Sequence, residues 1–147
     1  MRAAGLVQFR KLKLMAPVSV LVIDSNPVFL RFVVQFLDEQ YGETIHVAGA
    51  AFREADALTL AAAINPQAVL IGMSGSIGAA LGLIAALRRL LPSLEVVAMS
   101  QLGAAGYAQA ALAAGASAFV DKDQLRVDLA PAILQVANSR LQSQVMS

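Results

Sequence analysis

A short, unbroken apolar run at residues 68–71 constrains the fold more than any other feature of the sequence. Its β-branched members, Val69 and Ile71, favour a strand over a helix, and the run stops at a glycine. A strand that is apolar on both faces is typical of a parallel sheet covered by helices on each side. The run therefore predicts a central strand at residues 67–71, followed by a glycine- and serine-rich loop at residues 72–78.

Strand and helix patterns alternate along the rest of the chain. Asn26 followed by Pro27 predicts a helix start, because asparagine caps the first turn and proline suits its first position. Five strands alternating with five helices on short connections predict an α/β fold with a doubly wound parallel sheet. The predicted strands are residues 18–23, 44–51, 67–71, 94–99 and 118–120, and the predicted helices are residues 27–41, 53–64, 80–91, 103–114 and a last helix capped by Asp128, with Pro131 in its first turn.

Length and composition exclude several classes of protein. A chain of 147 residues fits one domain, and 58% hydrophobic against 14% charged residues excludes a disordered protein. No apolar run reaches the roughly 20 residues that cross a bilayer. The absence of cysteine excludes disulfides, thiolate chemistry and cysteine-based zinc sites, and fits a reducing cytoplasm, where we expect the protein to be.

The charge is distributed unevenly along the chain. The first fifteen residues carry four basic groups and no acid, whereas residues 15–147 carry seven basic and ten acidic groups and a net charge of −3. We therefore expect neither direct nucleic-acid binding nor membrane association by the folded part. The expected organisation is a basic tail or mis-assigned start at residues 1–16 (with initiation at Met1 or Met15), one domain at residues 17–143, and a tail at residues 144–147 without an effector module.

Five blocks of sequence together resemble a known family. In order they are VLVIDSNPVFLRFVVQFL, VAGAAFREADALTL, PQAVLIGM, VVAMS and AGASAFVDKD. Their order and spacing are similar to those of the CheY-like receiver domain of bacterial two-component response regulators, in particular the LuxR/NarL type, over residues 18–141. The resemblance implies a flavodoxin-like fold with a five-stranded parallel sheet in the order 2-1-3-4-5, and a role in signal transduction.

The resemblance also implies where a phosphorylation pocket would lie. In the family, two adjacent acids after the first strand hold Mg²⁺, and an aspartate ending the third strand takes a phosphoryl group. A Thr or Ser after the fourth strand and a Lys after the fifth bind the phosphate. By position, Asp24 matches the first acid, Ser25 replaces the second, Gly72 replaces the acceptor, Ser100 matches the hydroxyl residue, Lys122 matches the lysine, and Phe119 takes the aromatic switch position.

The departures from the family pattern decide the chemistry that we expect. A mixed anhydride with phosphate needs a carboxylate nucleophile, and Gly72 has no side chain to offer. Asp24 is the one acid left for a metal, so we expect no cofactor and at most weak Mg²⁺ binding. Lys122 and Asp24 are instead expected to form a structural salt bridge. Ser100 either caps the following helix or keeps an anion contact.

Other chemistries have less support from the residues. Ser74 and Ser76 could replace the missing acceptor only with a general base, and none is evident nearby. The single histidine, His46, lies in a predicted strand with no route to either serine, so a catalytic triad is not expected. An anion or small-molecule module using the Gly72–Gly78 loop is the alternative function.

The sequence thus predicts an atypical receiver that is not an enzyme and acts as a phosphorylation-independent protein–protein interaction module. In the family, the fourth helix, fifth strand and fifth helix commonly mediate dimerisation or partner docking. Here the fourth helix is rich in alanine and carries no charge, which favours association of apolar surfaces. The predicted face for a protein partner or a homodimer comprises Tyr107, Ala111, Leu112 and Phe119.

Overall fold

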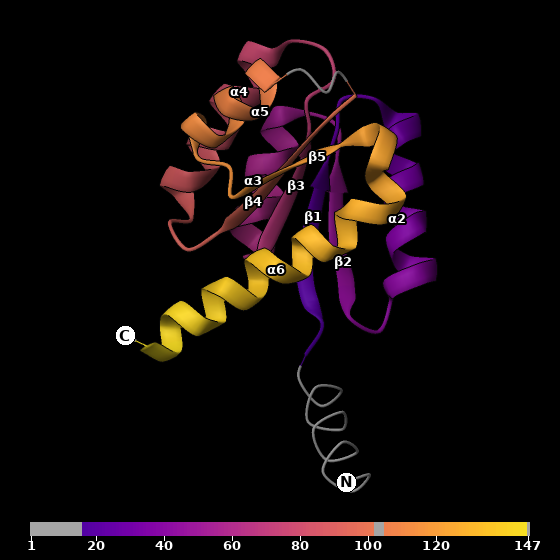
Figure 1. The fold of residues 1–147 in the computed structure, drawn as a ribbon. Coiled ribbons are helices and arrows are strands. Elements are labelled where there is room, and N and C mark those ends of the chain that lie inside the picture. The colour runs from indigo at the N-terminus through magenta and orange to yellow at the C-terminus, as the bar shows by residue number, and fades with distance from the viewer. Residues whose placement is uncertain (1–15, 102–104, 147) are drawn as a thin grey trace, which may run out of the picture.

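The computed structural model describes residues 16–101 and 105–146 and forms a single α/β sandwich (Figure 1). Five parallel strands lie in the order β2-β1-β3-β4-β5, which confirms the predicted flavodoxin-like fold. The elements are β1 (Val18–Ile23), α2 (Pro27–Tyr41), β2 (Ile45–Ala51), α3 (Glu54–Ile64), β3 (Ala68–Gly72), α4 (Ile77–Leu90), β4 (Glu95–Ser100), α5 (Ala105–Ala114), β5 (Ala118–Asp121), the 3₁₀ turn η1 (Lys122–Gln124) and α6 (Leu125–Met146).

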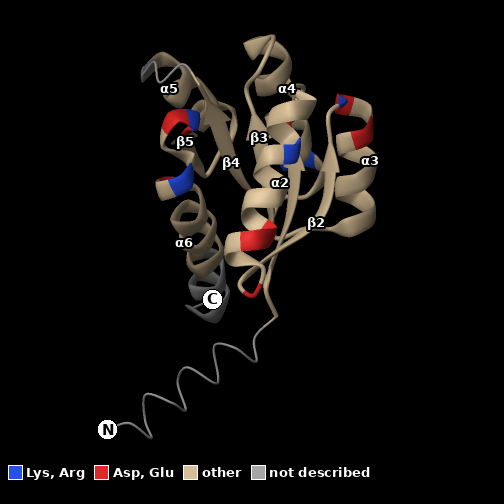
Figure 2. Ribbon diagram, turned by 90° about the vertical axis from the view of Figure 1, so that its right-hand side faces the viewer, with Lys and Arg blue, Asp and Glu red and all other residues tan. Residues whose placement is uncertain are grey.

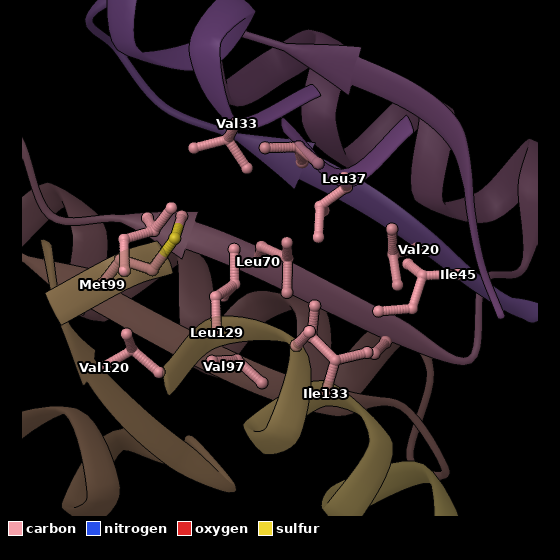
Figure 3. Packing of buried hydrophobic residues seen from close by; sticks show 14 of the residues in the cluster. Val20, Val33, Leu37, Ile45, Leu70, Val97, Met99, Val120, Leu129 and Ile133 are labelled. Carbon is pink, nitrogen blue, oxygen red and sulfur yellow. The ribbon is translucent and has the colours of Figure 1, made fainter. Parts of the chain in front are cut away.

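Two apolar clusters, one on each face of the sheet, form the core. Alternate residues of β1 point to opposite faces, so that Val20 and Val22 join one cluster while Leu21 and Ile23 join the other. Helices α2 and α6 cover the first cluster, in which Leu37 and Ile133 pack around Leu70 (Figure 3). Helices α3, α4 and α5 cover the second. The central strand β3 is buried throughout, as its apolar run predicted.

The helix starts follow from local capping chemistry. The side chain of Asn26 accepts hydrogen bonds from the backbone N–H groups of Val28 and Phe29, at 3.0 and 3.2 Å, which confirms the predicted start of α2. Asn65 ends α3 in the left-handed conformation, with φ of 51°, directly before Pro66. Of these two caps, Asn26 lies just after β1, at the carboxyl edge of the sheet where the candidate site lies.

The predicted glycine loop is shorter than its sequence indicated. Gly72 belongs to β3, because its backbone pairs with Met99 of β4. Gly78 lies inside α4, which begins at Ile77 because the Ser76 hydroxyl accepts a hydrogen bond from the N–H of Ala79, at 3.3 Å. The prediction of a loop over residues 72–78 was therefore wrong, and the connection is residues 73–76.

The start of the last helix was also predicted wrongly. The Asp121 side chain caps η1 by accepting from the N–H of Asp123, at 2.9 Å, and η1 leads directly into α6 at Leu125. Asp128 therefore lies within the first turn, and Pro131 lies inside the helix. Because Pro131 is exposed, water can satisfy the carbonyl group that loses its helical N–H partner. Helix α6 continues to Met146, into the segment assigned to a C-terminal tail.

Candidate functional site

A buried ion pair lies at the carboxyl edge of the sheet. Asp24 directly follows β1 and is fully buried, and Lys122 directly follows β5 with 7% of its side chain exposed. Lys122 Nζ donates to Asp24 Oδ2 at 2.8 Å, while Asp24 Oδ1 accepts from the N–H of Asn26 at 2.8 Å. The predicted salt bridge is confirmed. Both carboxylate oxygens have partners, so the cost of burying the charge is offset.

The Asp24 carboxylate lies where a side chain at residue 72 would begin. A Cβ atom built on Gly72 would overlap Oδ2 and Cγ of Asp24, and it would lie 3.0 Å from Asp24 Cβ. The neighbouring strands bring the two residues together, since Ile23 of β1 pairs with Ile71 of β3. Glycine at position 72 is therefore a steric condition for this placement of Asp24.

Lys122 makes two further contacts in the same pocket. Its ammonium group donates to Ser74 Oγ at 2.7 Å and lies 3.9 Å from the centroid of the Phe29 ring. The exposed Ser25 donates its hydroxyl to the backbone carbonyl of Ser74, at 3.1 Å. The contacts of Ser74 and Phe29 with Lys122 were not predicted from sequence, because no sequence pattern marks this serine or this phenylalanine as a partner of the lysine.

The remaining predicted residues occupy different parts of the domain. Ser100 ends β4 and is 1% exposed, and Phe119 is half-buried against the second core cluster. On α5, Leu112 is 49% exposed and Tyr107 is half-buried, whereas Ala111 is fully buried. Including Ala111 in a partner-docking face was therefore wrong, because its methyl group belongs to the core under α5.

A cavity of about 430 Å³ opens beside Lys122. Apolar side chains of α2 form one wall, and polar groups from the strand ends form the other. The lining residues are Asn26, Val28, Phe29, Phe32, Ser74, Gln101, Lys122 and Asp123. The ion pair is therefore adjacent to a surface opening, although Asp24 itself is not exposed.

Among the described residues, the acidic groups at this edge of the sheet offer few ligands for a divalent cation. Mg²⁺ is held by carboxylates and other oxygen ligands, and both oxygens of Asp24 already accept hydrogen bonds. Ser25, its neighbour, has no charge and bonds to Ser74. Within the described part of the chain, no group of three or more His, Asp or Glu side chains is placed to bind a metal ion. At the position of the family's two acids, the described residues offer Mg²⁺ one carboxylate, that of Asp24, which already accepts two hydrogen bonds.

Sequence and structure comparisons identify the family. The model of the response regulator receiver domain matches residues 20–134, so the chain belongs to this family of two-component signalling modules. No curated protein matches the chain significantly. Of the helices that the structure describes, none has both the length and the hydrophobicity to span a membrane.

Solved structures agree with this assignment. The signal receiver domain of the response regulator NarL from Mycobacterium tuberculosis is 30% identical, with a TM-score of 0.73 over 84% of this chain and 98% of that one. A LuxR-family DNA-binding response regulator from Staphylococcus aureus (20% identity, TM-score 0.70, 82% and 98% covered) and a CheY-like receiver protein from Methanospirillum hungatei (17%, 0.72, 87% and 99%) share the fold.

Proposed function

We propose that this receiver works without phosphorylation, as a protein–protein interaction module. The observation that supports the proposal is the position of Asp24, whose carboxylate fills the space beside Gly72. The family resemblance assigns the phosphoryl acceptor to that position. Glycine offers no nucleophile there, and the Asp24 carboxylate that fills the space is buried and engaged through both oxygens.

The arrangement of Lys122 supports the same proposal. In the family, the equivalent lysine binds the phosphate, whereas here the ammonium group already contacts Asp24, Ser74 and the Phe29 ring. A phosphoryl group that bound here could pair with Lys122 only after the buried ion pair between Lys122 and Asp24 had broken. Removing one partner of such a pair typically costs about 3–5 kcal/mol, which opposes the exchange.

The same contacts argue against an enzyme. A protonated lysine has three donors and no acceptor, so Lys122 paired with Asp24 cannot take a proton from the Ser74 hydroxyl. His46 is exposed on β2 and pairs with Ser19 near the amino end of β1. Ser74 lies at the opposite, carboxyl edge of the sheet. Among the described residues, Ser74 therefore has no general base in contact with it, and we assign the protein no catalytic role.

The partner-docking face of the proposal comprises the fourth helix, the fifth strand and the fifth helix of the expected fold, which are α5, β5 and α6. Helix α5 has no charged residue, and Figure 2 shows it without any blue or red segment. Leu112 projects from this helix with half of its surface exposed, and Tyr107 and Phe119 are partly accessible on α5 and β5. An uncharged surface with aromatic and leucine side chains is typical of the centre of a protein interface.

Thermal unfolding with beryllofluoride and Mg²⁺ tests the phosphorylation-independent role. We expect no change in the melting temperature of the native protein, because neither the anion nor the metal has a ligand set. The double variant Ser25→Asp/Gly72→Asp introduces the second metal-binding acid and the acceptor aspartate of the family. Its melting temperature with and without the two additives is compared with that of the native protein. A concentration-dependent rise in the melting temperature of the native protein would contradict the proposal, whatever the variant does.

A matched pair of surface variants tests the docking face. Leu112→Asp places a charge on α5, and Leu90→Asp places one on α4, where the leucine is similarly exposed at 44%. We expect Leu112→Asp to abolish the capture of partner proteins from a lysate of the native host and Leu90→Asp to leave it intact. Equal capture by both variants would refute the assigned face.

A further inference from the structure

A groove of about 510 Å³ lies between α3 and α4 and shares no residue with the cavity beside Lys122. The two helices pack side by side on the face of the sheet that carries the second core cluster. The lining residues of the groove are Leu58, Thr59, Ala62, Ala86, Arg89 and Leu90. The Thr59 hydroxyl donates to the carbonyl of Ala55 in the same helix, at 3.0 Å, so it is already satisfied. Arg89 is therefore the one charged group of an otherwise apolar groove.

Leu90 extends the apolar surface of the groove. It is the last residue of α4 and is 44% exposed. A single exposed leucine is common on protein surfaces, but Leu90 lines one groove with Leu58 and two alanines. Together they form an apolar patch that no described part of the chain covers. Apolar patches with a polar rim are typical of interaction surfaces.

The two ends of the groove carry opposite charges. Helices α3 and α4 run in the same direction, because each connects two parallel strands. Glu54 begins α3 one turn before Leu58, in the turn where the acids of this helix gather (Figure 2), and Arg89 lies in the last turn of α4. The two side chains are exposed and stand about one length of α3 apart, roughly 16 Å. Among the described residues, neither of them forms an ion pair.

We propose that two copies of this chain pair through the α3–α4 groove about a two-fold axis. Such an axis makes every contact occur twice, so that Glu54 of each copy meets Arg89 of the other. A second copy fits because a surface with an acid at one end, a base at the other and an apolar middle complements itself after half a turn. The exposed Leu90 of each copy then lies at the Leu58 end of the other groove, away from water. Because α4 lies between the groove and α5, this pairing leaves α5 free and does not depend on the state of the pocket.

Reversal of the two charges tests this pairing in the full chain. Arg89→Glu sets acid against acid, and Glu54→Arg sets base against base, so we expect each variant to dimerise at least about tenfold more weakly than the native chain. An equimolar mixture of the two variants should form heterodimers, because every reversed charge then faces one of opposite sign. Analytical ultracentrifugation measures all of these cases. A native chain that stays monomeric at every concentration, or a mixture that associates no better than either variant alone, overturns the proposal.

Two control variants locate the interface. Arg31→Glu makes the same change of charge on an exposed residue of α2, and Leu112→Asp alters the exposed leucine of α5. Both should leave the dimer intact, and circular dichroism would establish that every variant is folded. A dimer that either control breaks and Arg89→Glu does not would place the contact on another face and overturn the pairing. That result would leave the phosphorylation-independent role standing, because its own test is the response to beryllofluoride and Mg²⁺.

Discussion

The apolar core on the two faces of the sheet and the polar pocket at its carboxyl edge are organised in different ways. In the core, β1 sends alternate side chains into two separate clusters, and the helices add residues at the spacing of their turns. In the pocket, the position of the Asp24 side chain depends on the absence of a side chain at Gly72. Asp24 occupies its place because Gly72 has no Cβ atom.

The difference shows how a substitution propagates in each region. A core residue that loses a methyl group leaves a local defect, and distant defects add. The pocket residues instead share one buried charge pair, since Lys122 is the only cation that pairs with Asp24 among the described residues. Changes there are expected to be large and strongly non-additive.

The largest expected effect is that of Lys122→Met. This change leaves the buried Asp24 carboxylate without its cation, and we expect the free energy of unfolding to fall by about 3–5 kcal/mol. Urea denaturation followed by circular dichroism would measure it. The double variant Asp24→Asn/Lys122→Met should recover much of the loss, because it removes both charges. Additive losses would indicate that the pair does not organise the pocket.

A smaller effect is expected for Gly72→Ala. The added methyl group collides with Asp24, so the carboxylate and the strand must shift while the ion pair is kept, at a cost of about 1–3 kcal/mol. Gly82→Ala is the control, because a Cβ at Gly82 has no atom within 4 Å and lies in helix α4. That variant should gain up to about 1 kcal/mol from helix propensity. Similar unfolding energies for both variants would contradict the close contact.

The smallest effects test additivity in the core. Ile133→Val and Ile84→Val each remove one methyl group from fully buried residues, on opposite faces of the sheet. We expect each to cost about 0.5–1.5 kcal/mol, and the double variant to equal their sum within about 0.5 kcal/mol. A coupling as large as that in the pocket would remove the distinction between the two regions.

The sequence predicted the fold more completely than the site. The apolar run of β3 and the Asn26 cap act locally, so their patterns sufficed to place a strand and a helix start. The pairing of Asp24 with Lys122 could be predicted because both follow strands of one parallel sheet. The direction in which Asp24 turns could not, because it depends on Gly72 in a neighbouring strand rather than on adjacent residues.

Glycine and proline caused the errors in the predicted boundaries. The sequence predicted that the strand ends before Gly72. In the structure the backbone of Gly72 pairs with Met99 of β4, so Gly72 belongs to β3. The sequence predicted Pro131 in the first turn of a helix. In the structure it lies inside α6, on a face that is exposed to water. Glycine and proline indicate local backbone preferences. The actual boundaries of β3 and α6 depend on strand pairing and on exposure to solvent, which these preferences do not include.

Mass spectrometry of the intact protein isolated from its native host tests the central claim most directly. If the Asp24–Lys122 pair occupies the pocket in place of a reactive carboxylate, the native chain carries no acyl-phosphate, even after incubation with a small-molecule phosphodonor and Mg²⁺. We expect one unmodified mass that does not change on treatment with hydroxylamine. A phosphorylated species that hydroxylamine removes would contradict the account.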